Sequence, residues 1–285
     1  MYKYAPIPLI IAILFNIACT QHIETRTLSI SGIPDQSSAE LVRRFEILTD
    51  HLESHLNVKV EYIPTISYAA TVEAFKRGEI QLAWLGGLSS VQARNFVSGS
   101  KVIVQRERDA SFHSKFIAQS SLEIKTLSDL KGLTFTFGSP NSTSGHLMPR
   151  HFLLKSGINP ETDFQDIPSF SGSHDKTWAL VESGAYQAGV LSEAVWDAAV
   201  DSGRVDTTKI ESFYTSPPYY DYNWTVRGDL DETFGDGFTD RLKSILIAID
   251  NQEILDLFNA KKFIASDNFN YVEIENIARS LKILD

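Results

Sequence analysis

Short strand-like runs alternate with longer amphipathic stretches along most of the chain, and this alternation constrains the fold more than any other feature. Residues 28–31 read as a strand, and Ser37 or Ser38 could cap a helix that continues to about His55. Residues 58–62 then read as the next strand. Parallel strands need a long crossover connection, which is usually a helix. We therefore predict an α/β fold with mostly parallel strands.

The alternation continues in a second unit that begins near Phe116. We find no internal repeat, low-complexity tract or flexible linker between the units, which favours two lobes joined by strand-like crossings. The further segments that we predict are a helix capped by Ser67, strands at 80–85, 133–137 and 188–191, helices at 146–156, 176–183, 238–248, 253–260 and 271–281, and an extended aromatic region at 212–226.

The first 18 residues have the composition of a signal peptide. Lys3 is the only charged residue among the first 21, and residues 9–15 form an unbroken apolar run. From Ile7 to Ala18 there are only 12 residues, whereas a membrane-spanning helix needs about 20. We therefore expect export across a membrane and no permanent transmembrane helix.

Cys19 is the only cysteine of the chain, and it follows the small residue Ala18. This arrangement resembles the lipidation site of bacterial lipoproteins, although Asn16 stands where that pattern usually has leucine. We expect a lipid on Cys19; ordinary cleavage nearby and an uncleaved anchor are the alternatives. All three place the domain outside the cytoplasm, and without Cys19 the domain has no thiol for a disulfide or a metal site.

The formal net charge of −10 argues against a nucleic-acid partner, because phosphate backbones select for clustered lysine and arginine. An anion must therefore be held by local donors such as the N–H groups at a helix start. The best candidate is the run Ser142-Thr143-Ser144-Gly145, which follows a predicted strand and precedes a predicted helix. Ordinary helix capping by these hydroxyls is the alternative. Pro149 indicates that the regular helix begins nearer to Met148.

Four runs of the sequence resemble the substrate-binding proteins of phosphonate and phosphite ABC transporters. They are residues 64–68, 80–86, 142–149 and 171–175, and their order is that of the family. The resemblance implies a type II periplasmic binding fold, in which two α/β lobes are joined by two crossover strands around a ligand cleft. Lobe 1 is expected at 27–116 and 217–285, and lobe 2 at 117–216.

The resemblance also implies the residues of a site for a phosphorus oxyanion. Ser142, Thr143 and Ser144 match the family's oxyanion-binding turn, Tyr68 matches a tyrosine of the opposite lobe, and His174 matches a histidine of the second lobe. Asp221 matches, less closely, an acidic residue on the returning crossover. Where phosphonate binders tend to carry paired tyrosines this chain has Phe112-His113, which makes His113 a possible ligand contact.

Glu193 is a further acidic candidate, with a surface carboxylate as the alternative reading. A carboxylate suits an anion site when the ligand is a monoanion that still donates one O–H bond, as phosphite, phosphate and phosphonates do. Sulfate is fully deprotonated and would be repelled. The aromatic residues around Asp221 are most simply read as interlobe packing, and one or two could wall a tight cleft.

Catalysis, cofactors and metals have no support in the sequence. There is no nucleophile elbow, phosphate-loop lysine motif or dinucleotide glycine fingerprint. His51 and His55 have a spacing that can hold a metal on a helix, but no third ligand is evident. We therefore predict a monomeric periplasmic binding protein that closes on phosphite or a small phosphonate and delivers it to an ABC permease. A sensor subunit for a membrane receptor, a binder of another oxyanion such as phosphate, and an exported enzyme on the same fold are the alternatives.

Overall fold

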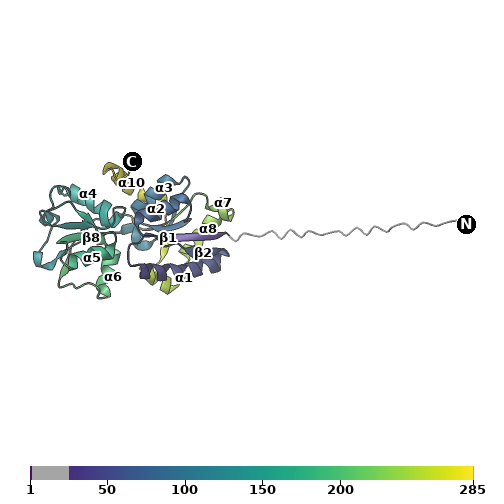
Figure 1. The fold of residues 1–285 in the computed structure, drawn as a ribbon, viewed down its shortest axis with the longest axis horizontal. Helices are drawn as coiled ribbons and strands as arrows, with labels where there is room; N and C mark the ends of the chain where they lie inside the picture. The colour runs from purple at the N-terminus through teal and green to yellow at the C-terminus, as the bar shows by residue number, and fades with distance from the viewer. Residues whose placement is uncertain (2–25, 285) are drawn as a thin grey trace.

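The computed structural model describes Met1 and residues 26–284, and separate sheets form the centres of its two lobes (Figure 1). The predicted signal peptide and Cys19 lie outside the described residues. Among the residues that are described, none of the helices combines the length and the apolar character that crossing a membrane would require.

Lobe 1 is built on a six-stranded sheet with the order β11-β4-β10-β3-β1-β2. Strands β1, β2 and β3 are parallel, whereas β10 runs antiparallel to both β3 and β4. The strands are β1 (Thr27–Gly32), β2 (Lys59–Tyr62), β3 (Leu82–Leu85), β4 (Lys101–Arg106), β10 (Asn223–Val226) and β11 (Phe263–Ala265).

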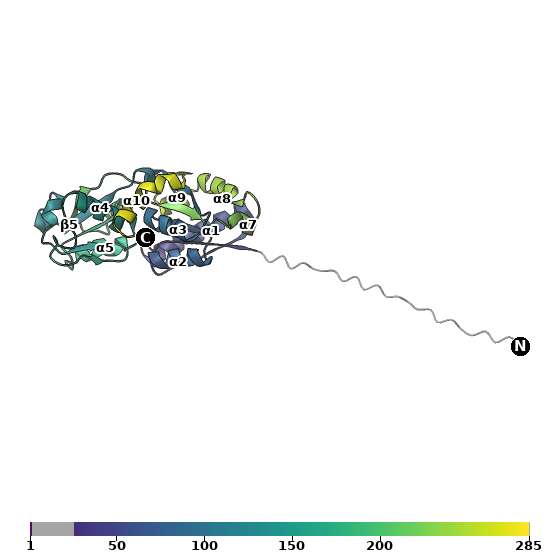
Figure 2. The same ribbon diagram turned by 90° about the horizontal axis from the view of Figure 1, so that it is seen from above.

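Helices cover both faces of this sheet (Figures 1 and 2). One group consists of α1 (Ser38–Leu56), α8 (Phe238–Ile247) and α9 (Gln252–Leu257), which pack together. The other consists of α2 (Tyr68–Arg77), α3 (Gly87–Phe96) and α10 (Val272–Ser280), and α7 (Leu230–Phe234) and the 3-10 turn η5 (Asn268–Tyr271) complete the lobe. The apolar stripe of α1 faces one large hydrophobic cluster between the layers.

Lobe 2 is built on a five-stranded sheet with the order β7-β6-β8-β5-β9. Its strands are β5 (Ser114–Gln119), β6 (Phe135–Phe137), β7 (Ser169–Phe170), β8 (Ala188–Ser192) and β9 (Ile210–Thr215). Its helices are α4 (Met148–Lys155), α5 (His174–Glu182) and α6 (Glu193–Asp201), with short turns η2 (Ser120–Leu122), η3 (Leu127–Leu130) and η4 (Thr143–Leu147). Two smaller hydrophobic clusters fill this lobe.

Two segments connect the lobes. The chain leaves β4 through the turn η1 (Glu107–Ser111) to reach β5, and it returns from β9 to β10. Phe112 and Tyr219 tie the two segments together through a pair of backbone hydrogen bonds of 2.8 and 3.0 Å. Strand β5 begins at Ser114, before the predicted lobe boundary at 116, and the boundary positions stay predictions.

Most of the predicted elements are present within a few residues of their expected limits. The regular helix α4 does begin at Met148, and the hydroxyl run before it forms the π-helical turn η4. The sequence patterns predicted no helix at the position of α3. The N-cap of α3, Gly86, and its first residue, Gly87, are both glycines, which are poor helix formers, so local propensity did not indicate the helix.

Candidate binding site

The hydroxyl turn Ser142–Gly145 lies at the boundary between the lobes, and all of its side chains are buried. Ser142 caps η4, because its Oγ accepts a hydrogen bond of 2.9 Å from the Gly145 N–H. The hydroxyl hydrogen of Ser142 is therefore available to another acceptor. The Ser144 carbonyl accepts a 2.8 Å bond from Ser114 Oγ, which fixes the turn against β5. A π-helical turn is rare and often occurs at functional sites.

The start of α3 in lobe 1 faces this turn across the lobe boundary. The Leu88 N–H donates to Thr143 Oγ1 at 2.9 Å, and the Gly87 N–H donates to Asp221 Oδ1 at 3.0 Å. The first N–H groups of a helix have no partner within the helix and carry partial positive charge. These two amides therefore hold a hydroxyl of lobe 2 and a carboxyl of the returning crossover at one place.

Asp221 is the acidic group of this cluster and is 1 % exposed. Burial raises the pKa of its carboxyl to about 7, although hydrogen bonding from Gly87, Thr143 and Ser144 opposes this rise. Its Oδ2 has no hydrogen-bond partner among the described residues. A buried polar atom without a partner is rare in proteins and is costly, so Oδ2 indicates where a ligand donor would bind.

His174 and Tyr68 complete the cluster from opposite lobes. His174 is the first residue of α5, and its Nδ1 accepts a 3.3 Å bond from the Ser192 N–H. Burial lowers the pKa of His174 to about 4, so the ring is neutral at neutral pH and carries its proton on Nε2. That nitrogen lies 3.5 Å from the Tyr68 hydroxyl oxygen. Burial also raises the pKa of Tyr68 well above its usual value, so both groups remain neutral donors.

The two lobes are closed on each other. The His174 N–H donates to the Asp35 carbonyl at 3.1 Å, and Asn141 Nδ2 donates to Gln92 Oε1 at 2.8 Å. Arg204 and Glu40 form an ion pair of 3.1 Å across the same boundary. These bonds join lobe 2 to lobe 1 on both sides of the hydroxyl turn.

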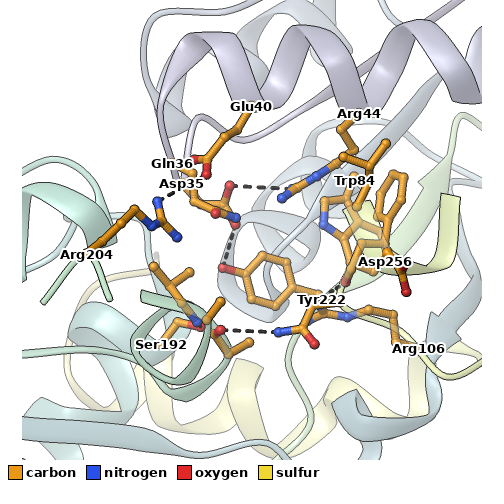
Figure 3. A pocket seen from close by; sticks show the side chains of 16 residues that line it. Asp35, Gln36, Glu40, Arg44, Trp84, Arg106, Ser192, Arg204, Tyr222 and Asp256 are labelled. Atoms are coloured by element: carbon orange, nitrogen blue, oxygen red, sulfur yellow. Dashed lines mark hydrogen bonds and ion pairs between the residues drawn. The ribbon is translucent and has the colours of Figure 1, made fainter. Parts of the chain in front are cut away.

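A cavity of about 180 Å³ lies between the lobes beside this cluster (Figure 3). Asp35 forms part of its wall, where it accepts a 2.9 Å bond from the Tyr222 hydroxyl and lies 3.9 Å from Arg44. Burial raises the pKa of Asp35. The sequence reading missed this buried acid, since a lone aspartate after a strand resembles a turn residue.

The side chains of His113 and Glu193 have partners outside this cluster. His113 Nδ1 bonds the Ser216 carbonyl at 2.7 Å within the crossover. The Glu193 carboxylate pairs with Lys115 at 3.3 Å and with Arg108 at 3.9 Å. These two cations neutralise the Glu193 carboxylate, whereas Asp221 Oδ2 has no partner among the described residues. We therefore leave His113 and Glu193 out of the site proposed below.

The family model for the periplasmic substrate-binding protein of phosphonate ABC transporters matches residues 30–271. The chain belongs to this family. A probable ABC transporter phosphite binding protein, PhnD1, from Prochlorococcus marinus (strain MIT 9301) is 43% identical over 267 residues, which are 90% of each chain. The phosphate-import protein PhnD of Mycolicibacterium smegmatis is 28% identical over 67% of this chain and 63% of its own length.

The structure of the Prochlorococcus marinus PhnD1 in complex with methylphosphonate matches with a TM-score of 0.88 and 42% identity, over 90% of this chain and 99% of that chain. This match confirms the predicted fold of two α/β lobes around a cleft. Membership of the family confirms that the chain is a periplasmic binding protein and not an enzyme, and that it works with an ABC permease. Within the described residues, no cluster of histidine, cysteine and acidic side chains could hold a metal.

Proposed function

We propose that this binding protein captures phosphite or a small phosphonate between Tyr68, Ser142, Thr143, Ser144, His174 and Asp221. The observation that carries the proposal is Asp221, a buried carboxyl without a partner on Oδ2 among several hydroxyl and imidazole donors. One acceptor among several donors fits an oxyanion that still has one proton of its own. The name of the phosphite binding relative supports this class of ligand.

The state of protonation separates the candidate anions. Phosphate-type groups lose their second proton in the region of pH 6, so near neutral pH a fraction of the ligand is a monoanion whose O–H can donate to Asp221 Oδ2. Sulfate has no proton to donate, and its charge would meet the carboxylate directly. The site geometry therefore favours phosphorus oxyanions over sulfate.

The closeness of the lobes favours a small ligand. Tyr68 and His174 approach each other to 3.5 Å across the cleft, and both are almost completely buried. A large substituent on phosphorus would have to separate these side chains and give up the bonds between the lobes. The methylphosphonate complex of PhnD1 supports a one-carbon substituent as an acceptable size.

Calorimetric titration of the domain without its first 19 residues tests the proposal, because both sheets and all three hydrophobic clusters lie within residues 26–284. Phosphite, methylphosphonate, phosphate, a bulky phosphonate and sulfate are titrated in one buffer. We expect tight binding of phosphite or methylphosphonate, weak binding of the bulky phosphonate and none of sulfate. If phosphate, the ligand class named for the Mycolicibacterium smegmatis relative, bound best, it would replace phosphite as the proposed ligand. Binding of sulfate would contradict the role of Asp221.

We further propose that a lipid on Cys19 tethers the monomeric protein to a membrane, because the sequence around Cys19 resembles a lipoprotein signal. Intact mass spectrometry of detergent-extracted protein should show the added acyl chains. A Cys19→Ser variant should then leave the membrane fraction, and light scattering of the domain should give the mass of a monomer. An unmodified cysteine in the membrane-bound protein would contradict the lipid anchor.

A further inference from the structure

We propose that Gly86, at the start of α3, is a positioning residue that couples recognition of the oxyanion to closure of the lobes. The inference rests on the proposed function of the site, and it concerns a backbone element that makes no side-chain contact with a ligand. Gly86 lets two groups from different regions of the chain, Thr143 and Asp221, reach the first amides of α3.

The contacts at this helix start come from both lobes. Leu88 N–H holds Thr143 of lobe 2, whereas Gly87 N–H holds Asp221 of the returning crossover. The Thr143 bond crosses the lobe boundary, so it forms only when the lobes are closed. The Asp221 bond turns one carboxyl oxygen toward the helix and leaves the buried Oδ2 without a partner among the described residues. This orphan oxygen is independent evidence that the helix start faces a ligand.

The direction of the Leu88 bond decides what Thr143 can do. Because Thr143 Oγ1 accepts the Leu88 N–H, its own hydrogen must point away from that amide, toward Asp221 or toward a bound oxyanion beside it. Closure therefore sets the donor direction of a hydroxyl in lobe 2 by means of an amide in lobe 1. A ligand that needs this donor gains it only in the closed form, so binding and closure favour each other.

The space around Gly86 explains why a side chain is absent. A Cβ at this position would lie 3.1 Å from Asp221 Oδ1 and 3.2 Å from Thr143 Oγ1. Both distances are tighter than ordinary contacts, and both atoms are the ones that α3 holds. The backbone angles of Gly86, φ −73° and ψ 162°, are accessible to alanine. A methyl group at Gly86 would thus push on Thr143 and Asp221 without straining the backbone.

Gly86→Ala tests the inference in the domain without its first 19 residues, with the best-bound phosphorus oxyanion from the titrations as the probe. We expect about tenfold weaker binding and less ligand-induced compaction in small-angle X-ray scattering. The matched control is Gly237→Ala. Gly237 also caps a lobe 1 helix without a side-chain bond, but its φ is +73° and its Cβ would meet no atom within 4 Å. This variant should lower the melting temperature and leave the affinity unchanged.

A double-mutant cycle separates a positioning role from a general structural one. In a Thr143→Ala background the Oγ1 that the new methyl group would meet is gone, so the added loss from Gly86→Ala should shrink. The same loss in both backgrounds, or wild-type affinity of Gly86→Ala, would overturn the inference. If the wild-type domain bound none of the anions, the proposed function would fail. Amide exchange at Leu88 would still test the inference, because Gly86→Ala should speed that exchange, and an unchanged rate would contradict it.

Discussion

Two helix starts face each other across the lobe boundary, and they are built in opposite ways. The start of η4 in lobe 2 presents three consecutive hydroxyl side chains, and Ser142 caps its own turn. The start of α3 in lobe 1 faces Thr143 and Asp221 with backbone amides, since Gly86 and Gly87 carry no side chain; the Ser89 hydroxyl of the same turn bonds the Asn141 carbonyl at 3.0 Å. One start supplies groups that can bind an anion, and the other supplies amides that orient those groups.

The difference shows that a ligand site needs binding groups and also enough space for those groups to approach each other. Side chains on both helix starts would collide, as the short distances from Gly86 to Thr143 and Asp221 indicate. The bare start of α3 lets the hydroxyl-rich start of η4 approach until a hydrogen bond crosses the cleft. The two starts therefore act as a pair.

Thr143→Val should have the largest effect, because it removes the contact that joins the two starts. Valine has the shape of threonine but leaves the Leu88 N–H without an acceptor and the ligand without a donor. The two losses together should weaken binding by about 3 kcal/mol, or about a hundredfold. Calorimetry with the best-bound anion measures this loss.

Thr143→Ser is the control for this prediction, because serine keeps the hydroxyl and removes only a methyl group. It should bind within about tenfold of wild type, since removal of one buried methyl costs about 1 kcal/mol. Equal losses in the two variants would mean that packing of the methyl group, and not the hydroxyl, determines the affinity.

Asp221→Asn should remove the pH dependence of the binding affinity, which in the wild type is up to about tenfold per pH unit. It should also change which anions bind. Above about pH 7 the Asp221 carboxyl, with its pKa raised by burial to about 7, and the ligand have both lost their protons. Binding to wild type must then take up one proton, so affinity falls as the pH rises, by up to about tenfold per unit. Asparagine donates from Nδ2 to a dianion, so in this variant the fall should disappear and sulfate should bind.

Titrations of wild type and Asp221→Asn at several pH values between 6 and 9 test whether the affinity falls with rising pH only in the wild type. The stability of the closed wild-type form should also fall as the pH rises from 3.8 toward 7, since the folded state still holds a proton that the unfolded chain has released. Parallel pH profiles for the two proteins would show that Asp221 does not share the proton of the ligand.

The contrast between the two helix starts also explains which residues of the site the sequence could predict. The η4 start was readable because Ser142, Thr143 and Ser144 carry their chemistry in side chains. The α3 start was not, because glycines after a strand indicate only that the strand ends. Asp35 was missed for a related reason: its bonds to Tyr222 and to the His174 N–H depend on residues far away in the sequence.

The α/β class was predictable because strand and helix periods are local properties of the chain. The pairing of β10 between β3 and β4 was not, since it depends on the return of the chain from lobe 2. Glu193 shows the same limit. Its residue type and its place after a strand agree with a ligand contact, and only the structure reveals that Lys115 and Arg108 neutralise it.

Ser142→Ala should have the smallest effect, because Ser142 acts within its own helix start and has no bond to α3. Loss of its cap on the Gly145 N–H should lower the free energy of unfolding by about 1 kcal/mol, and loss of its hydroxyl hydrogen, which lies beside Tyr68, should weaken binding less than Thr143→Val does. Asn251→Ala is the matched control, since Asn251 caps α9 of lobe 1 through the Glu253 and Ile254 N–H groups and does not line the cavity between the lobes. It should lower stability alone, as measured by urea unfolding and calorimetry. If Ser142→Ala weakened binding as strongly as Thr143→Val, the contact between the two helix starts would not be the feature that sets the affinity.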